Sequence, residues 1–83
     1  MSTHHLLMIE DDVRLAAMVS EYLTQSGFRV THMADGGAGL AALQDQPFDL
    51  VILDLMLPDI DGLEVCRRIR ALPGEAEIGR AHV

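Results

Sequence analysis

Two short, continuously apolar runs constrain the fold of this chain more than any other feature of its sequence. They lie at residues 5–9 and 49–53, and each contains four consecutive apolar side chains. Runs of this kind are typical of strands that are buried on both faces, as in a parallel sheet covered by helices. A third run, residues 29–34, mixes polar and apolar side chains and predicts a strand at the edge of the same sheet.

Amphipathic helical patterns separate and follow the predicted strands. Apolar side chains recur at three- and four-residue spacing from Leu15 to Leu23, with Asp12 placed to cap this helix and Gly27 placed to end it. Residues 36–46 and 63–72 predict a second and a third helix. A strand–helix order repeated three times predicts an α/β domain with a parallel sheet and right-handed crossovers.

Composition excludes several classes of function. The 83 residues are enough for one small domain, and no apolar run approaches the roughly 20 residues of a membrane span. The formal charge is −7, every basic residue is an arginine and lysine is absent, which argues against a nucleic-acid surface. The single cysteine, Cys66, cannot form an internal disulfide and fits a reducing compartment, so we expect a cytoplasmic protein.

Acidic residues follow both apolar runs at the same end. Glu10 and Asp11 come directly after the first run, and Asp54 comes directly after the second. The carboxyl ends of neighbouring parallel strands meet at one edge of a sheet, so these three carboxylates are expected to converge there. Crowded carboxylates repel one another, and a hard divalent ion with oxygen ligands, Mg²⁺, suits such a cluster. Helix capping explains Asp12 but does not explain the other three acids together.

Two segments carry motifs of a known family. Residues 6–12 read Leu-Leu-Met-Ile-Glu-Asp-Asp, and residues 49–62 read Asp-Leu-Val-Ile-Leu-Asp-Leu-Met-Leu-Pro-Asp-Ile-Asp-Gly. Together they resemble the receiver domains of bacterial two-component response regulators, and the positions of Pro58 and Gly62 match as well. The resemblance extends to Leu72 and implies a flavodoxin-like parallel sheet with helices on both faces. It is closest to regulators whose receiver precedes a winged-helix DNA-binding domain.

The resemblance implies a role for each acidic residue. Asp54 matches the aspartate that takes a phosphoryl group from a sensor histidine kinase. Asp11 matches the direct Mg²⁺ ligand, Glu10 matches the acid that holds the metal partly through water, and Met56 matches the residue whose backbone carbonyl completes the site. The resemblance therefore implies a phosphorelay signalling module, not an enzyme. DNA binding and control of transcription would belong to a C-terminal domain outside this segment, and no membrane association is expected.

The resemblance is incomplete at the carboxyl end of the chain. A complete receiver has five strands and five helices, with a Ser or Thr after the fourth strand and a Lys after the fifth. This chain has no lysine, and no apolar run follows Pro73. We therefore predict a receiver truncated to βαβαβα, with residues 1–76 as its N-terminal part and residues 77–83 as a tail outside the family. The codons for this tail can contain a common sequencing-library adapter, so we interpret it as translated adapter sequence.

Truncation has predicted consequences for the fragment. Its third strand would be an open edge, which favours pairing with other chains. The loss of covering helices would leave the fragment weakly stable, because whole domains are stable by only about 5–15 kcal/mol. The fragment would also lack the phosphorylation switch and the dimerisation surface of the full receiver.

A second interpretation is a nucleotide-dependent α/β enzyme. Gly37 and Gly39 open a G-x-G-x-x-A motif after a strand, and Asp54 follows seventeen residues after the first of them, the outline of a dinucleotide-binding fingerprint. The preceding strand is too polar for that fingerprint, which also leaves Glu10 and Asp11 unexplained. NAD or FAD would bind only under this interpretation, whereas Mg²⁺ binding is expected of a receiver. A third interpretation is a folded or partly folded fragment without activity.

The remaining candidate residues fit structural or solvated roles. Cys66 lies on the apolar face of the third predicted helix and is expected in the core. Three arginines at positions 67, 68 and 70 form a small cationic face on that helix, which is expected to be solvated. The four histidines lack the spacing of metal ligands and are expected to be solvent-exposed or terminal: His4, His5, His32 and His82.

Overall fold

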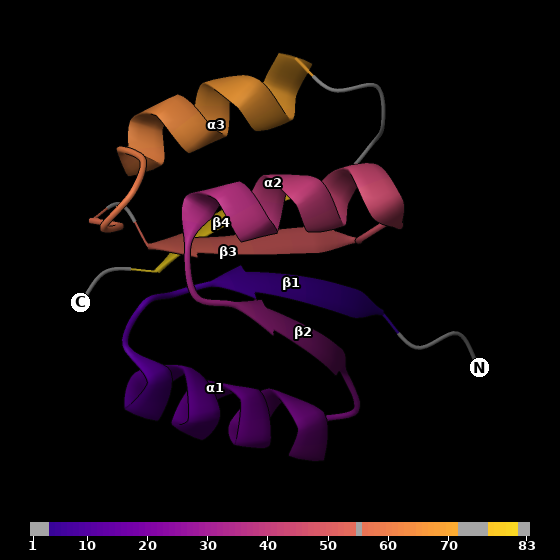
Figure 1. The fold of residues 1–83 in the computed structure, drawn as a ribbon. Coiled ribbons are helices and arrows are strands. Elements are labelled where there is room, and N and C mark those ends of the chain that lie inside the picture. Colours follow the sequence, from indigo (N-terminus) through magenta and orange to yellow (C-terminus); the bar gives the residue numbers. More distant parts are fainter. Residues whose placement is uncertain (1–3, 55, 72–76, 82–83) are drawn as a thin grey trace.

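The computed structural model describes residues 4–54, 56–71 and 77–81 (Figure 1). Strands and helices alternate along the chain. The predicted boundaries of the first three strands and of the helices agree with those in the structure to within two residues. The elements are β1 (His5–Ile9), α1 (Val13–Gln25), β2 (Arg29–Met33), α2 (Gly36–Asp45), β3 (Leu50–Asp54), α3 (Gly62–Ala71) and β4 (Glu77–Ala81).

The four strands form one parallel sheet in the order β2-β1-β3-β4. The two apolar runs, β1 and β3, are neighbours in the middle of the sheet, and the more polar β2 lies at an edge, as its sequence predicted. Helix α1 covers one face of the sheet, and α2 and α3 cover the other (Figure 1). The flavodoxin-like arrangement with helices on both faces is confirmed.

The larger part of the core lies between the sheet and the pair α2 and α3. Leu7, Ile9, Val51 and Leu53 alternate along β1 and β3 with residues of the opposite face, and each is fully buried. They pack in one cluster with side chains of both helices, including Cys66, whose predicted core position is confirmed. On the other face, α1 contributes Ala16 as its one buried residue. The two faces of the sheet are therefore unequally covered.

A fourth strand follows α3, which corrects two of our expectations. β4 pairs in parallel with β3, from Leu50 opposite Glu77 to Asp54 opposite Ala81. The expectation that no strand follows Pro73 and that β3 is an open edge is therefore wrong. Sheet pairing uses backbone N–H and C=O groups that nearly every residue carries, so this segment pairs without an apolar run. Among the described strands, β4 rather than β3 lies at this edge of the sheet, so the prediction that an edge strand favours pairing with other chains now concerns β4.

Both ends of α1 have the structure that the sequence predicted. The Asp12 side chain accepts hydrogen bonds from the backbone N–H groups of Arg14 and Leu15, each at 3.1 Å. Gly27 lies just beyond the helix with φ at 98°, a left-handed conformation that favours glycine. Within the described residues, no helix combines the length and apolar character needed to cross a membrane.

Candidate functional site

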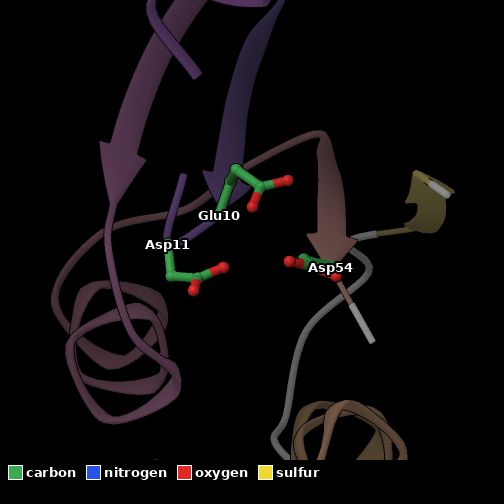
Figure 2. A group of neighbouring side chains, drawn as sticks. All are labelled: Glu10, Asp11 and Asp54. Carbon is green, nitrogen blue, oxygen red and sulfur yellow. The ribbon is translucent and has the colours of Figure 1, made fainter. Parts of the chain in front are cut away.

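Three carboxylates meet at the carboxyl ends of the two central strands. Glu10 and Asp11 directly follow β1, and Asp54 is the last residue of β3. Each side chain offers an oxygen atom that lies within 4.8 Å of an oxygen from each of the other two (Figure 2). The predicted convergence is therefore present, because the two strands are adjacent and parallel and end at the same edge of the sheet.

Burial makes this cluster electrostatically costly. Glu10 is 4% exposed and Asp54 is 9% exposed, while Asp11 is open to solvent. Burial, together with the neighbouring Asp54 and Asp11 carboxyl groups, raises the pKa of Glu10 to about 7. Burial alone would also raise the pKa of Asp54. Hydrogen bonds from the Met56 N–H and with Glu10 and Asp11 outweigh that effect, so the pKa of Asp54 is lowered. The two shifts run in opposite directions, so ionisation is favoured at Asp54 and disfavoured at Glu10.

The cluster has the composition of a site for a hard cation. None of the ion pairs formed by the side chains of residues 4–54 and 56–71 involves Glu10, Asp11 or Asp54. Carboxylate oxygens are the ligands that hard divalent ions prefer, and a bound cation would reverse the repulsion that raises the pKa of Glu10. The donor set therefore fits a divalent cation.

Hydrogen bonds hold Glu10 in place from three sides. Its backbone N–H donates to the carbonyl oxygen of Met33 at 3.0 Å, which extends the β1–β2 pairing by one residue. Its carbonyl oxygen accepts from Nε2 of His32 at 2.7 Å, and its carboxylate accepts from the Asp12 N–H at 3.1 Å. His32 is thus part of the site's support, which the sequence analysis missed. Its place near the carboxyl end of the edge strand is the signal that could have identified it.

The solvent-exposed position expected for the histidines is only partly correct. His32 is half-buried, and so is His5, whose Nε2 lies 2.7 Å from Oγ1 of Thr31. The expectation is wrong for these two because both side chains hydrogen-bond within the sheet. His4 is exposed as expected, and His82 lies outside the described residues.

The loop after Asp54 closes on itself. Met56 donates its backbone N–H to Oδ1 of Asp54 at 3.0 Å and forms an isolated antiparallel bridge with Asp61. Its side chain is 83% exposed. Pro58 is exposed in this loop, and Gly62 is buried at the start of α3. The loop thus places a backbone segment beside Asp54, while the role of the Met56 carbonyl as a metal ligand stays a prediction.

The glycines of the alternative dinucleotide fingerprint have structural explanations. A Cβ atom at Gly39 would overlap the side chain of Ile9, so this glycine lets α2 approach β1 closely. The backbone N–H of Gly37, which would bind a phosphate in a dinucleotide site, donates instead to Oδ2 of Asp59 at 2.9 Å. The enzyme interpretation has no support in this geometry.

A parallel α/β sheet that gathers three acidic side chains at the ends of its central strands is the arrangement expected of the receiver class of signalling domain. The chain belongs to the response regulator receiver domain family, whose family model matches residues 6–79. The match passes residue 76, where we predicted the receiver part to end. The origin of the codons for residues 77–83 stays a prediction.

Curated relatives of this chain are regulators of transcription and signalling. The chain is 52% identical over 65 residues to the transcriptional regulatory protein AfsQ1 of Streptomyces coelicolor. The aligned segment covers 78% of this chain and 29% of that protein. It is 47% identical over 66 residues to the response regulator ArlR of Staphylococcus epidermidis, covering 80% and 30%. The chain thus spans less than a third of the length of these relatives.

Solved structures share the fold. A response regulator receiver domain from Methylobacillus flagellatus superimposes with a TM-score of 0.93 and 31% identity, covering 98% of this chain and 70% of that chain. The response regulator TrrA of Thermotoga maritima, solved in complex with Mg²⁺ and BeF, superimposes with a TM-score of 0.87 and 30% identity, covering 92% and 66%.

Proposed function

We propose that Asp54 accepts a phosphoryl group from the phosphohistidine of a sensor histidine kinase and that the reaction uses Mg²⁺. The observation that carries this proposal is the convergence of Glu10, Asp11 and Asp54 within 4.8 Å at the end of the central strands. The complex of TrrA with Mg²⁺ and BeF supports it, because that similar protein binds a divalent ion together with a small fluoride complex.

Each residue has a separate role in the proposed site. Asp11 would hold Mg²⁺ directly, Glu10 would hold it partly through water, and Asp54 and the backbone carbonyl of Met56 would complete the set. When bound, the ion supplies positive charge beside the transferred group. An Asp54 oxygen forms a bond to phosphorus as the phosphorus–nitrogen bond of the donor breaks, and the donor imidazole recovers a neutral form by taking up a proton. The lowered pKa of Asp54 keeps this oxygen ionised for attack.

The longer protein would use this event to control transcription. AfsQ1 is a transcriptional regulatory protein, and this chain matches 29% of it, so we propose that a C-terminal domain contacts DNA. In this proposal the chain is a cytoplasmic phosphoacceptor that does not turn over a substrate as an enzyme does. In this proposal the native receiver sequence ends at residue 76 and the codons for residues 77–83 derive from adapter sequence, even though residues 77–81 pair with β3 and the family match extends to residue 79. Sequencing the source DNA with a different library chemistry tests the last point, and recovery of the same seven codons would contradict it.

Mass spectrometry of the phosphorylated chain tests the central proposal. With Mg²⁺ and a small phosphodonor such as phosphoramidate, the wild-type chain should gain the mass of one phosphoryl group, and Asp54→Asn should gain none. Asp45→Asn, which changes an exposed aspartate in the last turn of α2, is the matched control and should be labelled like the wild type. Labelling of Asp54→Asn at full stoichiometry would refute the assignment.

A further inference from the structure

The carboxylate of Asp59 joins the loop after Asp54 to the start of α2. Its Oδ1 accepts the backbone N–H of Gly36 and its Oδ2 accepts the backbone N–H of Gly37, both at 2.9 Å. These N–H groups belong to the first turn of α2, which has no partners for them within the helix. One side chain from a distant loop therefore makes two hydrogen bonds to two successive residues of the helix.

The helix has a second cap that does not involve the loop. Asp35 precedes α2 and accepts the N–H of Ala38 through Oδ1 at 2.7 Å, in the usual manner of an N-cap. Gly39 donates its N–H to the backbone carbonyl of Asp35 at 3.1 Å. The N–H groups in the first turn of α2 thus have acceptors from two segments: Asp35, which precedes the helix, and Asp59, which lies in the loop.

The approach of the loop to α2 depends on a small residue. A Cβ atom at Gly36 would lie 3.1 Å from Cγ2 of Val65, 3.3 Å from Cβ of Ile60 and 3.4 Å from Oδ1 of Asp59. The missing side chain leaves room for the loop and for α3. Leu57 and Ile60, which flank the loop tip, pack against the core, whereas Asp59 is exposed and attaches the tip to α2 through its hydrogen bonds.

The loop between Asp54 and α3 is consequently held at both its base and its tip. At the base, Met56 donates to Asp54 and pairs with Asp61, whose side chain accepts the N–H of Leu63 at 2.8 Å. At the tip, Asp59 attaches to α2. The two N–H donors from α2 lower the pKa of Asp59, so the carboxylate stays ionised at neutral pH. Loss of the Asp59 contacts would leave Met56 held by the base of the loop and by the packing of Leu57 and Ile60 against the core.

We propose that Asp59 is a positioning residue for the metal centre: by attaching the loop tip to α2, it holds Met56 beside Asp54. This inference rests on the proposed function, in which the Met56 carbonyl is a metal ligand. Asp59 does not itself contact the site. Its loss is expected to weaken Mg²⁺ binding by about threefold to tenfold, below the roughly 10–100-fold effect of residues that hydrogen-bond a metal ligand directly, because Asp59 acts through the loop.

Mg²⁺ titration of the 83-residue chain by calorimetry, with four variants, tests the proposal. Asp59→Ala removes both acceptor oxygens, and Asp59→Asn keeps one of them, so the dissociation constant should rise most in the first and less in the second. Asp35→Ala removes the other cap of the same helix and leaves the loop attached. It should lower the midpoint of thermal unfolding but keep the Mg²⁺ affinity within about twofold of the wild type. Asp11→Ala removes a proposed metal ligand.

Each outcome separates the inference from the proposed function. If Asp59→Ala and Asp35→Ala bind Mg²⁺ with equal affinity, Asp59 is only a helix cap and the inference is wrong. If the wild type does not bind Mg²⁺, or Asp11→Ala binds it equally well, the proposed function itself fails. Should Asp59→Ala not fold, Asp59→Asn decides the question, because its Mg²⁺ affinity must still lie below that of Asp35→Ala. Amide resonances of Met56 that broaden in the Asp59 variants but not in Asp35→Ala provide a second readout.

Discussion

The imidazole of His32 donates a hydrogen bond from Nε2 to the backbone carbonyl oxygen of Glu10, at 2.7 Å. This contact joins the end of the edge strand to the first residue of the acidic cluster. It acts on the backbone of Glu10, whose side chain is then fixed by the Asp12 N–H. The site is therefore supported by β2 as well as by the two strands that carry its carboxylates.

Replacing His32 with leucine should leave the Glu10 carbonyl without this donor. The loss of one half-buried hydrogen bond is expected to lower the free energy of unfolding by about 0.5–1.5 kcal/mol. Urea denaturation measures the change. His4→Leu is the control, because His4 is exposed and its 3.7 Å contact with the Asp49 carboxylate is open to solvent, so this variant should stay within about 0.5 kcal/mol of the wild type. If the free energy of unfolding falls equally in both variants, the hydrogen bond from His32 does not contribute to stability beyond the effect of replacing a histidine.

Two glycines in α2 should respond in opposite directions to alanine. At Gly39 the new methyl group would overlap Ile9, and forcing extra volume into a packed core costs about 1–3 kcal/mol. At Gly37 the nearest atom to a Cβ is Oδ2 of Asp59 at 3.4 Å, an ordinary contact, so the helix propensity of alanine should stabilise the protein by up to about 1 kcal/mol. Thermal unfolding followed by circular dichroism compares the pair. A Gly39→Ala variant as stable as Gly37→Ala would contradict the packing described for α2 and β1.

The stability of the metal-free protein should fall as the pH rises through the range in which Glu10 titrates. The pKa of Glu10 is about 7 in the folded state, against an ordinary value of 4.5. The folded protein therefore holds this proton more tightly than the unfolded chain does, and the resulting stability is present below the ordinary pKa and lost as the pH passes the folded one. Glu10→Gln removes this titration. The free energy of unfolding of the variant minus that of the wild type should therefore rise by on the order of 1–3 kcal/mol between about pH 5 and about pH 8.

Chemical denaturation at the two pH values, without divalent ions, measures this difference. Mg²⁺ should then stabilise the wild type at the higher pH more than it stabilises Glu10→Gln, because the ion binds the folded state and favours the ionised carboxylate. A stability difference that does not change with pH would show that Glu10 titrates normally.

Variants of two neighbouring aspartates, Asp11 and Asp12, should distinguish metal binding from helix capping at the start of α1. Asp11→Ala should weaken Mg²⁺ binding strongly and have a small effect on folding, because Asp11 is exposed and belongs to the acidic cluster. Asp12→Ala should cost about 0.5–2 kcal/mol of stability, because Asp12 caps α1, and should change Mg²⁺ affinity less. Calorimetric titration and thermal unfolding of both variants give the comparison. Equal Mg²⁺ affinities would mean that the two roles are wrongly assigned.

The acidic cluster could be predicted from sequence because topology alone brings it together. Once β1 and β3 were identified as adjacent parallel strands, the residues that follow them had to share one edge of the sheet. β4 could not be predicted in the same way, because its pairing with β3 uses backbone groups and residues 77–81 show no apolar pattern. A hydrophobic pattern indicates that side chains are buried, and an edge strand can form with few buried side chains.

The contacts of Asp59 and His32 could not be predicted for a different reason. Each joins residues more than twenty positions apart in the chain, and neither residue type specifies which distant group it will meet. Asp59 and Asp61 look equivalent in the sequence Asp-Ile-Asp-Gly, yet one reaches across to α2 and the other caps α3. Such assignments depend on the relative placement of loop and helix, which becomes known only when the packed structure is known.

The parallel register of the sheet sets the order in which the chain can fold during synthesis. β1 is made first, but its pairing with β3 joins Leu6 to Leu50, 44 positions later. At a synthesis rate of about 5–20 residues per second, the nascent β1 waits roughly 2–9 seconds for that neighbour. Throughout this interval at least one edge of an apolar strand is unpaired, which leaves the nascent chain open to association with other chains until β3 has been made.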